Sequence, residues 1–264
     1  MGIRNRSSGG IDGVNRTLAS AASALLLAVA VAGARPAAAQ DRFRFELEGG
    51  AAWQLRNDFA VPGDTGTRIA LDEVTQGPVA AFRGTLWADV SKRTSLRLLA
   101  APLRTTASLT PDTPVDFNGT TFPGGQPLDV TYVFNSYRLS YVYRFKSSGP
   151  VSFRAGLTGK IRDAKIELTG SGLQSTKENT GFVPLLYGGV RWQMTDTLAL
   201  DLDVDAAAAK QGRAEDVALR LEAKVSPKVD LFVGARTLEG GADNDEVYSF
   251  AWFAYAVGGV SIRF

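Results

Sequence analysis

Residues 248–264 read YSFAWFAYAVGGVSIRF, and their side chains change character with a period of two. The apolar face carries Tyr248, Phe250, Trp252, Ala254, Ala256, Val260, Ile262 and Phe264. Successive side chains of a β-strand point to opposite faces, so this repeat predicts a strand with two different surroundings. The stretch is also about three times as long as the 5–6 residues usual in soluble sheets. It predicts an all-β fold with unusually long strands.

The same repeat recurs throughout the chain after residue 40. In 43–55, 198–206 and 217–225, apolar residues alternate with charged ones. We predict about ten antiparallel strands, at 42–55, 78–90, 94–106, 128–145, 150–168, 181–193, 197–207, 214–226, 228–239 and 246–264.

Two irregularities accompany this pattern. Strands 78–90 and 181–193 alternate poorly, which leaves eight or twelve strands as alternatives. Ile161 and Ile166 are out of phase with each other, which predicts a β-bulge near Asp163.

The connections between the predicted strands alternate in length. Short turns are expected at 91–93, 146–149, 194–196 and 226–227, and longer links at 56–77, 107–127, 169–180, 208–213 and 240–245. Short turns on one side, longer links on the other and an even strand number are typical of an outer-membrane barrel. Both ends of the barrel domain then lie on the periplasmic side.

This layout predicts a closed antiparallel transmembrane β-barrel, because every backbone donor and acceptor must be paired in hydrocarbon. The alternative is a secreted soluble sandwich or lipocalin-like barrel, in which the apolar face points inward. Three features favour the membrane: a charged face of mixed Arg, Asp and Glu, an apolar face with many Ala and Gly, and aromatic residues near strand ends. Those aromatic residues are Tyr141, Tyr143, Phe145, Phe153, Trp192, Tyr248, Phe250 and Trp252.

Residues 1–39 are predicted to form a secretory signal peptide, followed by the barrel domain at 40–264. An arginine-containing start precedes the apolar run 18–32, and the small residues 37–39 supply a cleavage site at Ala39. The run is shorter than the roughly 20 residues that span a bilayer as a helix; a permanent anchor is the alternative. Removing 1–39, with four arginines and one aspartate, leaves 25 basic and 26 acidic residues. The basic composition therefore belongs to the leader, and nucleic-acid binding is not expected.

The composition excludes several kinds of chemistry. The chain contains no cysteine and no histidine. It therefore has no disulfides, thiolate nucleophile or lipid-modified N-terminal Cys, and no Ser-His-Asp triad or imidazole metal site.

The end of the chain, VGGVSIRF at 257–264, resembles the terminal signal of Gram-negative outer-membrane barrels. Gly259, Ile262 and Phe264 match that signal, whereas Val257 stands where a polar residue is commoner. The resemblance implies insertion by the barrel-assembly machinery after export through the secretion translocon.

Three further stretches resemble signatures of an uncharacterised small-barrel family: GKIRDAKIEL (159–168), QGRAEDVALRLE (211–222) and RTLEGGADNDEVYSFAWFAYA (236–256). No function attaches to them. The omptin, deacylase, palmitoyltransferase and phospholipase barrels resemble one another in needing a catalytic histidine, so their activities are not expected here.

The charged face of the strands is expected to line the lumen. Its residues are Arg44, Glu46, Glu48, Arg83, Arg138, Arg144, Arg154, Lys160, Arg162, Arg191, Asp201, Asp203, Asp205, Arg220, Glu222, Lys224, Asp230 and Arg236. Ten strands enclose a lumen only slightly wider than that of eight, which side chains just fill. Ion pairs among these residues are therefore expected to fill it; a narrow hydrophilic channel with the same lining is the alternative.

Metal binding and catalysis by carboxylates are weaker hypotheses. Asp201, Asp203 and Asp205 stand roughly 7 Å apart along a strand, too far for one calcium cage, and are expected to form salt bridges. The acidic link with Asp243, Asp245 and Glu246 is a weak calcium candidate, with a solvated turn as the alternative. Paired acids hydrolyse glycosides, but Glu46 and Glu48 have no evident substrate groove.

We therefore expect an integral outer-membrane β-barrel protein that is not an enzyme and has no cofactor. Its expected role is structural or surface-binding, with a narrow porin-like channel for small solutes as the alternative. Its expected partners are outer-membrane lipid and the export and assembly machinery, and a monomer is favoured.

Overall fold

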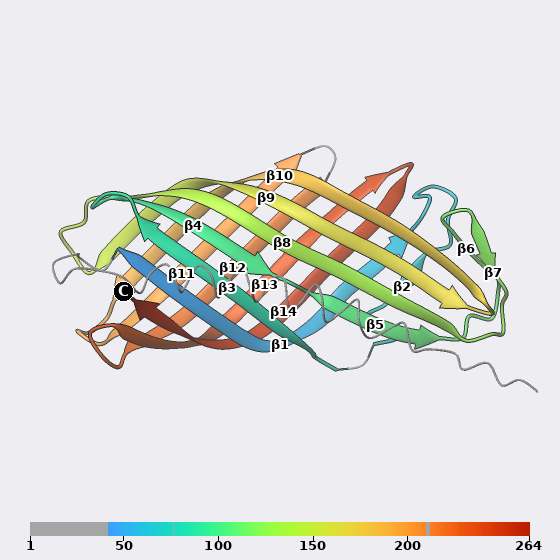
Figure 1. The fold of residues 1–264 in the computed structure, drawn as a ribbon, viewed down its shortest axis with the longest axis horizontal. Helices are drawn as coiled ribbons and strands as arrows, with labels where there is room; N and C mark the ends of the chain where they lie inside the picture. Colours follow the sequence, from blue (N-terminus) through green and yellow to red (C-terminus); the bar gives the residue numbers. More distant parts are fainter. Residues whose placement is uncertain (1–41, 76, 210–211) are drawn as a thin grey trace, which may run out of the picture. The chain divides into compact units, whose positions relative to one another are not determined.

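Long antiparallel strands lie side by side around a common axis in the computed structural model (Figure 1). The structure describes residues 42–75, 77–209 and 212–264; the predicted signal peptide and its cleavage site lie outside them. The strands are β1 (Phe43–Ala60), β2 (Ile69–Ala70), β3 (Val79–Asp89), β4 (Thr94–Ala101), β5 (Arg104–Leu109), β6 (Val115–Phe117), β7 (Thr120–Phe122), β8 (Leu128–Arg144), β9 (Val151–Gly170), β10 (Leu173–Gln193), β11 (Leu198–Ala209), β12 (Gly212–Lys224), β13 (Val229–Asn244) and β14 (Val247–Arg263).

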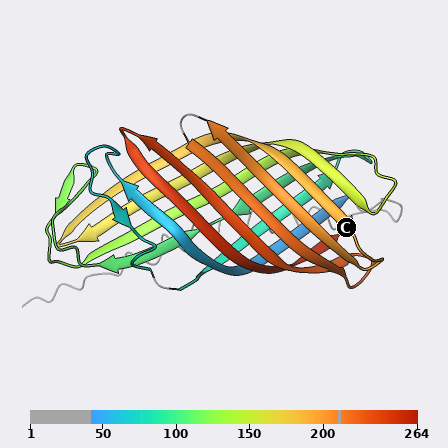
Figure 2. The same ribbon diagram turned by 180° about the vertical axis from the view of Figure 1, so that it is seen from behind.

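The sheet closes because its first and last long strands pair. β1 and β14 are antiparallel from Arg44 opposite Arg263 to Ala60 opposite Tyr248. β4 and β5 both pair with β8 and together occupy one position in the wall, so the barrel has ten strands. Figure 2 shows β11 to β14, orange to red, side by side on the opposite wall. The predicted all-β, closed ten-strand barrel is confirmed, and the alternatives of eight or twelve strands are wrong.

We call the end of the barrel with Phe43 and Arg263 the terminal end, and the opposite end the loop end. The four short turns predicted from the sequence connect strands at the terminal end. At the loop end, however, three of the five predicted long links are much shorter than expected. Strands β9 to β14 extend as hairpins, and the long loop-end connections among the described strands are β1–β3 and β5–β8.

The predicted link 169–180 illustrates why. Ser171 and Gly172 have positive φ angles of 52° and 76° and form a two-residue turn between β9 and β10. Turns of this kind favour residues that tolerate positive φ. The following residues, QSTKENT, are polar on both faces and show no alternation. A strand that rises out of an apolar layer into water needs no alternation, so the pattern missed it.

The bulge predicted near Asp163 is wrong. β9 keeps its register with both neighbours across Asp163, and a register shift occurs instead in β1, between Gln54 and Arg56. Ile161 points outward and Ile166 points inward on a regular strand. Both positions are apolar because the interior changes from charged to apolar along the barrel.

The outer surface of the wall carries a broad set of exposed large apolar side chains. They include Leu47, Trp53, Phe82, Leu98, Leu139, Phe153, Leu157, Phe182, Leu186, Trp192, Leu219, Leu221, Leu231, Val233, Trp252 and Ile262. Alternate residues of the same strands are buried inside the barrel, as the period of two predicts. In the described part of the chain, no helix has the length and apolar character needed to cross a membrane.

The loop end of the interior is closed by an apolar cluster that we call the cap. The β1–β3 connection contributes Val61 and Leu71, and the β6–β7 hairpin contributes Phe117 and Phe122; all four are buried. Phe117 packs edge-on against Phe59, with ring centroids 6.0 Å apart. The hairpin is also tied to the β1–β3 connection by backbone hydrogen bonds, including Asn118 N to Val61 O at 2.7 Å.

Candidate functional site

The terminal half of the interior is filled by arginines and carboxylates from opposite walls. Asp216 of β12 is a central member of this set. Its carboxylate accepts contacts from Arg83 at 2.9 Å, Arg138 at 2.7 Å and Arg236 at 2.5 Å, which come from β3, β8 and β13. Since Asp216 is only 3% exposed, one carboxylate joins three strands to β12 inside the barrel.

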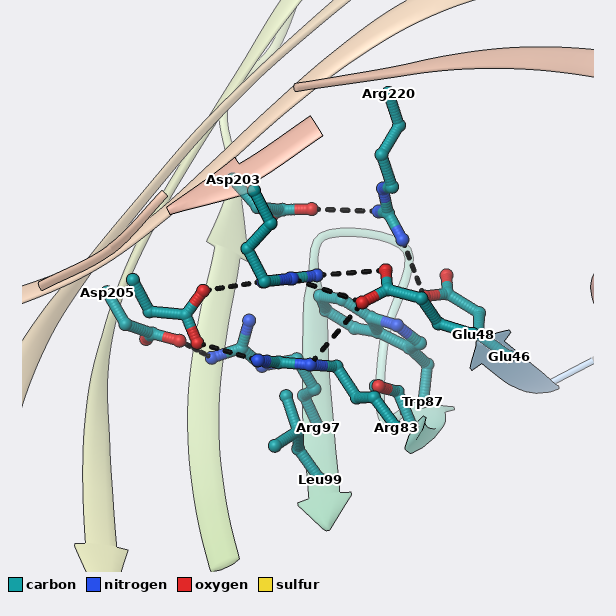
Figure 3. Close-up of a pocket in the computed structure, with 12 residues that line it drawn as sticks. Glu46, Glu48, Arg83, Trp87, Arg97, Leu99, Asp203, Asp205 and Arg220 are labelled. Carbon is teal, nitrogen blue, oxygen red and sulfur yellow. Dashed lines mark hydrogen bonds and ion pairs between the residues drawn. The ribbon is translucent and has the colours of Figure 1, made fainter. Parts of the chain in front are cut away.

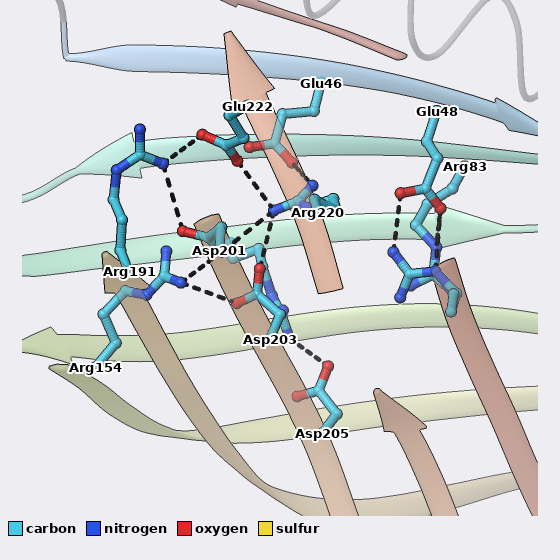
Figure 4. A network of polar contacts seen from close by, with 12 residues as sticks. Glu46, Glu48, Arg83, Arg154, Arg191, Asp201, Asp203, Asp205, Arg220 and Glu222 are labelled. Carbon is cyan, nitrogen blue, oxygen red and sulfur yellow. Dashed lines mark hydrogen bonds and ion pairs between the residues drawn. The ribbon is translucent and has the colours of Figure 1, made fainter. Parts of the chain in front are cut away.

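A second group surrounds Arg220. Its guanidinium reaches Glu46 of β1 at 3.1 Å and Asp203 of β11 at 2.9 Å (Figure 4). Arg154 of β9 donates to Asp201 at 2.7 Å. Gly189, directly opposite Arg154, leaves room for it, because a Cβ at that position would lie 2.7 Å from Arg154 Nε.

Asp205 connects the β4 and β8 walls to β11. Arg97 donates to it at 2.6 Å (Figure 3). Arg138 and Thr158 each donate to it at 2.8 Å. Ser140 accepts from Arg97 as well, at 2.9 Å. Because Arg138 also contacts Asp216, this group and the Asp216 group form one continuous network.

Further ion pairs lie toward the terminal end. Arg191 pairs with Glu222 and, at 3.4 Å, with Asp201. Arg263 pairs with Asp230. Arg144 pairs with Asp89, with both side chains about two-fifths exposed. The charged interior thus continues to the terminal rim, where water reaches it.

The structure places most of the residues predicted to line the lumen in this network. Those with ion pairs to another strand or to a neighbouring lumen residue are Arg44, Glu46, Glu48, Arg83, Arg138, Arg144, Arg154, Arg191, Asp201, Asp203, Asp205, Arg220, Glu222, Asp230 and Arg236. Three predicted residues differ. Lys160 is buried but places its ammonium 4.8 Å over the ring of Phe134. Arg162 bonds to Asn179 instead of a carboxylate. Lys224 is exposed and lies outside the network, because β12 ends there.

Two central residues were missed by the sequence prediction, Arg97 and Asp216. The alternation along their strands identifies both residues, because each lies on the charged face. Asp216 shares a face with Arg220 and Glu222 on one strand, and Arg97 alternates with Leu96 and Leu98 on another.

The spaces left inside this network are small. One cavity of about 20 Å³ lies among Glu46, Arg97, Asp205 and Arg220, in the view of Figure 3. A second, also about 20 Å³, lies closer to the cap, between Arg138 and Leu238. A cavity needs roughly 10–15 Å³ to hold one water molecule. Spaces of this size therefore accommodate water but no organic solute.

The described residues contain no ligand cluster for the metal sites considered from the sequence. Among the described residues, no three His, Cys, Asp or Glu side chains are grouped so that they could hold a metal ion. Asp243, Asp245 and Glu246 lie at the exposed β13–β14 turn. There Asn244 Oδ1 accepts hydrogen bonds from the backbone of Glu246 and Val247 at 3.1 and 3.0 Å. This is the solvated turn given above as the alternative to a calcium loop.

The three residues of the terminal signal lie on β14 or at its end. Gly259 faces Phe232 and Leu47, and a Cβ there would lie 2.3 Å from the Phe232 ring. Ile262 is exposed on the outer surface. Phe264 follows the strand.

Comparison with solved structures agrees with this architecture. The outer-membrane protease OmpT from Escherichia coli superposes with a TM-score of 0.53 at 10% identity, over 85% of this chain and 97% of that one. The fold is that of an outer-membrane β-barrel. The transport unit of the autotransporter AIDA-I from Escherichia coli gives a TM-score of 0.47 at 10% identity, over 93% and 98% of the two chains. Ail of Yersinia pestis gives 0.40 at 10% identity, over 84% and 99%. No protein-family model and no curated protein sequence matches the chain.

Proposed function

We propose that this protein is an integral outer-membrane β-barrel protein of a Gram-negative bacterium. Its charged lumen is filled, and its role is structural or surface-binding rather than enzymatic. The observation that carries this proposal is the interior itself, in which the Asp216 network and the cap close the barrel at successive levels. A barrel whose interior is filled both by this network and by the cap serves as a rigid support for the hairpins at its loop end.

The outer surface supports the membrane location. Exposed Leu, Phe, Val and Trp side chains cover the wall on all sides, whereas a soluble protein rarely exposes an apolar patch of more than a few hundred Å². Aromatic residues Tyr141, Phe145, Phe153 and Trp192 gather near the terminal end, where an interfacial girdle is expected.

The interior supports a role without catalysis. OmpT is a protease by name, but it shares only the fold with this chain, which contains no histidine. The lumen carboxylates are all engaged by arginines or hydroxyls in the described network. A carboxylate held in this way is not placed to act as a general acid or base on a substrate.

The narrow channel is the second candidate, favoured by the polar lining and by the water-sized cavities within it. Conduction through it would require the cap to move. Removing the β6–β7 hairpin separates the two candidates, because Gly125 N already bonds to Pro111 O at 2.7 Å and the ends can be joined.

We therefore expect no ohmic steps in planar-bilayer recordings, either from the intact protein or from a variant in which residues 112–124 are deleted. The Asp216 network below the cap still blocks ion passage in that variant. A heat-dependent gel shift of each sample provides the control for folding. Steps from the intact protein would overturn the filled-lumen proposal; steps only from the deletion variant would identify the cap as a channel gate.

We further propose that residues 1–39 are removed on export, that Gly259, Ile262 and Phe264 direct assembly, and that the barrel is monomeric. Truncation of the final Phe264 tests the assembly signal. The protein is then expected to accumulate in the periplasm rather than in the outer-membrane fraction, whereas Lys224→Ala, at an exposed position, should fractionate normally.

A further inference from the structure

The wall of the barrel is interrupted between β3 and β5. β3 and β4 pair only from Gly84 opposite Ala100 to Asp89 opposite Ser95. Beyond this, Val79–Arg83 of β3 keep β1 as their partner. β5 continues along β8 but pairs with no other strand in the described part of the barrel. The backbone ladder that closes the rest of the wall is therefore absent at this position.

A cavity lies at the same place and reaches from the outer surface to the interior. Its lining includes Phe82 and Pro102 from the outer side of the wall and Ala81, Leu103, Leu238 and Val257 from the inside. Phe82 is 62% exposed, whereas Ala81 and Leu103 are buried. Most of the lining is apolar, and its polar members are Glu48, Arg83, Ser136, Arg138, Arg236 and Tyr255.

The interruption borders the apolar outer surface. Ala100 lies next to the break and pairs with Tyr137, whose side chain points outward. The exposed Leu98 lies two residues nearer the terminal end on the same strand. On the other side, Val79 pairs with Ala52, adjacent to the exposed Trp53. If the exposed apolar surface faces lipid, the break opens into hydrocarbon near its outer boundary.

The inner end of the cavity is closed by charges that are already paired. Arg236 contacts Glu48 at 2.9 Å and Asp216 at 2.5 Å, and Arg83 contacts the same two carboxylates. Both arginines are therefore already paired with carboxylates. A molecule that enters from the side therefore meets mainly apolar side chains and, at the inner end of the cavity, arginines that are already paired with carboxylates.

We propose that the break between β3 and β5 is a lateral binding site for the end of a hydrocarbon chain of a membrane lipid. The proposal rests on the membrane location proposed above. Lipid is the occupant because the cavity is continuous with the lipid-facing surface and most of its lining is apolar. At about 20 Å³ the cavity is too small for an acyl chain as it stands, and the end of one enters only when the exposed Phe82 ring turns aside.

Tryptophan quenching by lipid brominated on its acyl chains tests this site. The three exposed tryptophans, Trp53, Trp192 and Trp252, are replaced by Phe, which leaves the buried Trp87 as an internal reference. A new tryptophan is then introduced as Leu103→Trp or, in a second variant, as Phe134→Trp; both positions line the cavity. Ile166→Trp provides the matched control, since Ile166 is buried on β9, one strand further from the break than Phe134 of β8. Each variant is reconstituted into phosphatidylcholine vesicles, and folding is checked by the heat-dependent gel shift.

The emission of the Leu103→Trp and Phe134→Trp variants is expected to fall in brominated vesicles by the same fraction as that of the native exposed tryptophans, whereas the Ile166→Trp emission should fall no more than that of Trp87. Quenching of Ile166→Trp to the same extent as the cavity variants, or no quenching in either cavity variant, overturns the lateral site. If Trp53, Trp192 and Trp252 of the unmodified protein are not quenched by the brominated lipid, the membrane location is overturned instead, so the two failures are distinguishable.

Discussion

Replacing Asp216 by alanine is expected to lower the free energy of unfolding by about 3–5 kcal/mol, the cost of removing one partner from a buried ion pair. Asp216 is buried and is shared by Arg83, Arg138 and Arg236. Without it, three guanidiniums remain close together inside the barrel with fewer carboxylates to compensate them. Urea titration of the folded barrel in lipid vesicles, followed by tryptophan fluorescence, measures the change.

Two other variants make this result specific. Asp216→Asn keeps the shape and one acceptor oxygen, so we expect a loss between that of the alanine variant and zero. Asp243→Ala removes an exposed aspartate at the β13–β14 turn, where a surface change is expected to stay within about 0.5 kcal/mol. Equal midpoints for Asp216→Ala and Asp243→Ala would show that the network does not hold the walls together.

Replacing Phe117 by alanine is expected to release the cap without unfolding the barrel. Phe117 is 0% exposed and packs on Phe59, and truncating a buried Phe to Ala costs about 3–5 kcal/mol. Since 1.4 kcal/mol is a factor of ten, the undocked population rises roughly a hundredfold or more. Cleavage before Asp116 of the hairpin, by an endoproteinase specific for the amino side of aspartate, should accelerate to the same degree, because proteolysis follows the open population.

Thr113→Ala is the matched control, since Thr113 is an exposed residue of the same β5–β8 connection. Its cleavage rate should equal that of the unmodified protein, and the barrel fragments of both variants should still resist unfolding on the gel. If Phe117→Ala is cleaved no faster than Thr113→Ala, the apolar contacts of Phe117 do not hold the hairpin in place.

The fold was predictable because the membrane imposes one rule on every strand. Within hydrocarbon, a strand must present apolar residues outward. Its other face lines a small lumen filled with ion pairs and is therefore charged. The period of two is strong from Leu198 to Asp205 for this reason. The rule ends where the strand leaves the apolar layer. The polar start of β10, the turn at Ser171 and the inward Ile166 all lie toward the loop end, and each was misread for this reason.

The candidate site was predictable in composition but not in connectivity. The charged face identified Glu48 and Arg236 as lumen residues. Their spacing in the sequence does not predict that Arg236 pairs with both Glu48 and Asp216, because the three residues come from β13, β1 and β12. The cap was not predicted either. Val115, Phe117 and Phe122 alternate only within a three-residue strand pair, and a turn at Asn118 and Gly119, with φ of 47° and 78°, directs them inward. The break between β3 and β5 depends on which strand pairs with which, and no local pattern carries that information.

The orientation of the two faces is the central claim, and nitroxide scanning of single cysteines tests it directly. The chain contains no native cysteine, so each substitution gives one labelled position. In lipid vesicles, labels at Leu219→Cys and Leu221→Cys, both exposed on β12, should collide freely with oxygen dissolved in the bilayer. Labels at Ala218→Cys and Ala199→Cys, which face the filled interior, should be shielded both from oxygen and from a water-soluble nickel complex. Labels at Leu219 and Leu221 that are accessible to the nickel complex, or shielded while those at Ala218 and Ala199 are accessible, would contradict a membrane barrel with its charges inside.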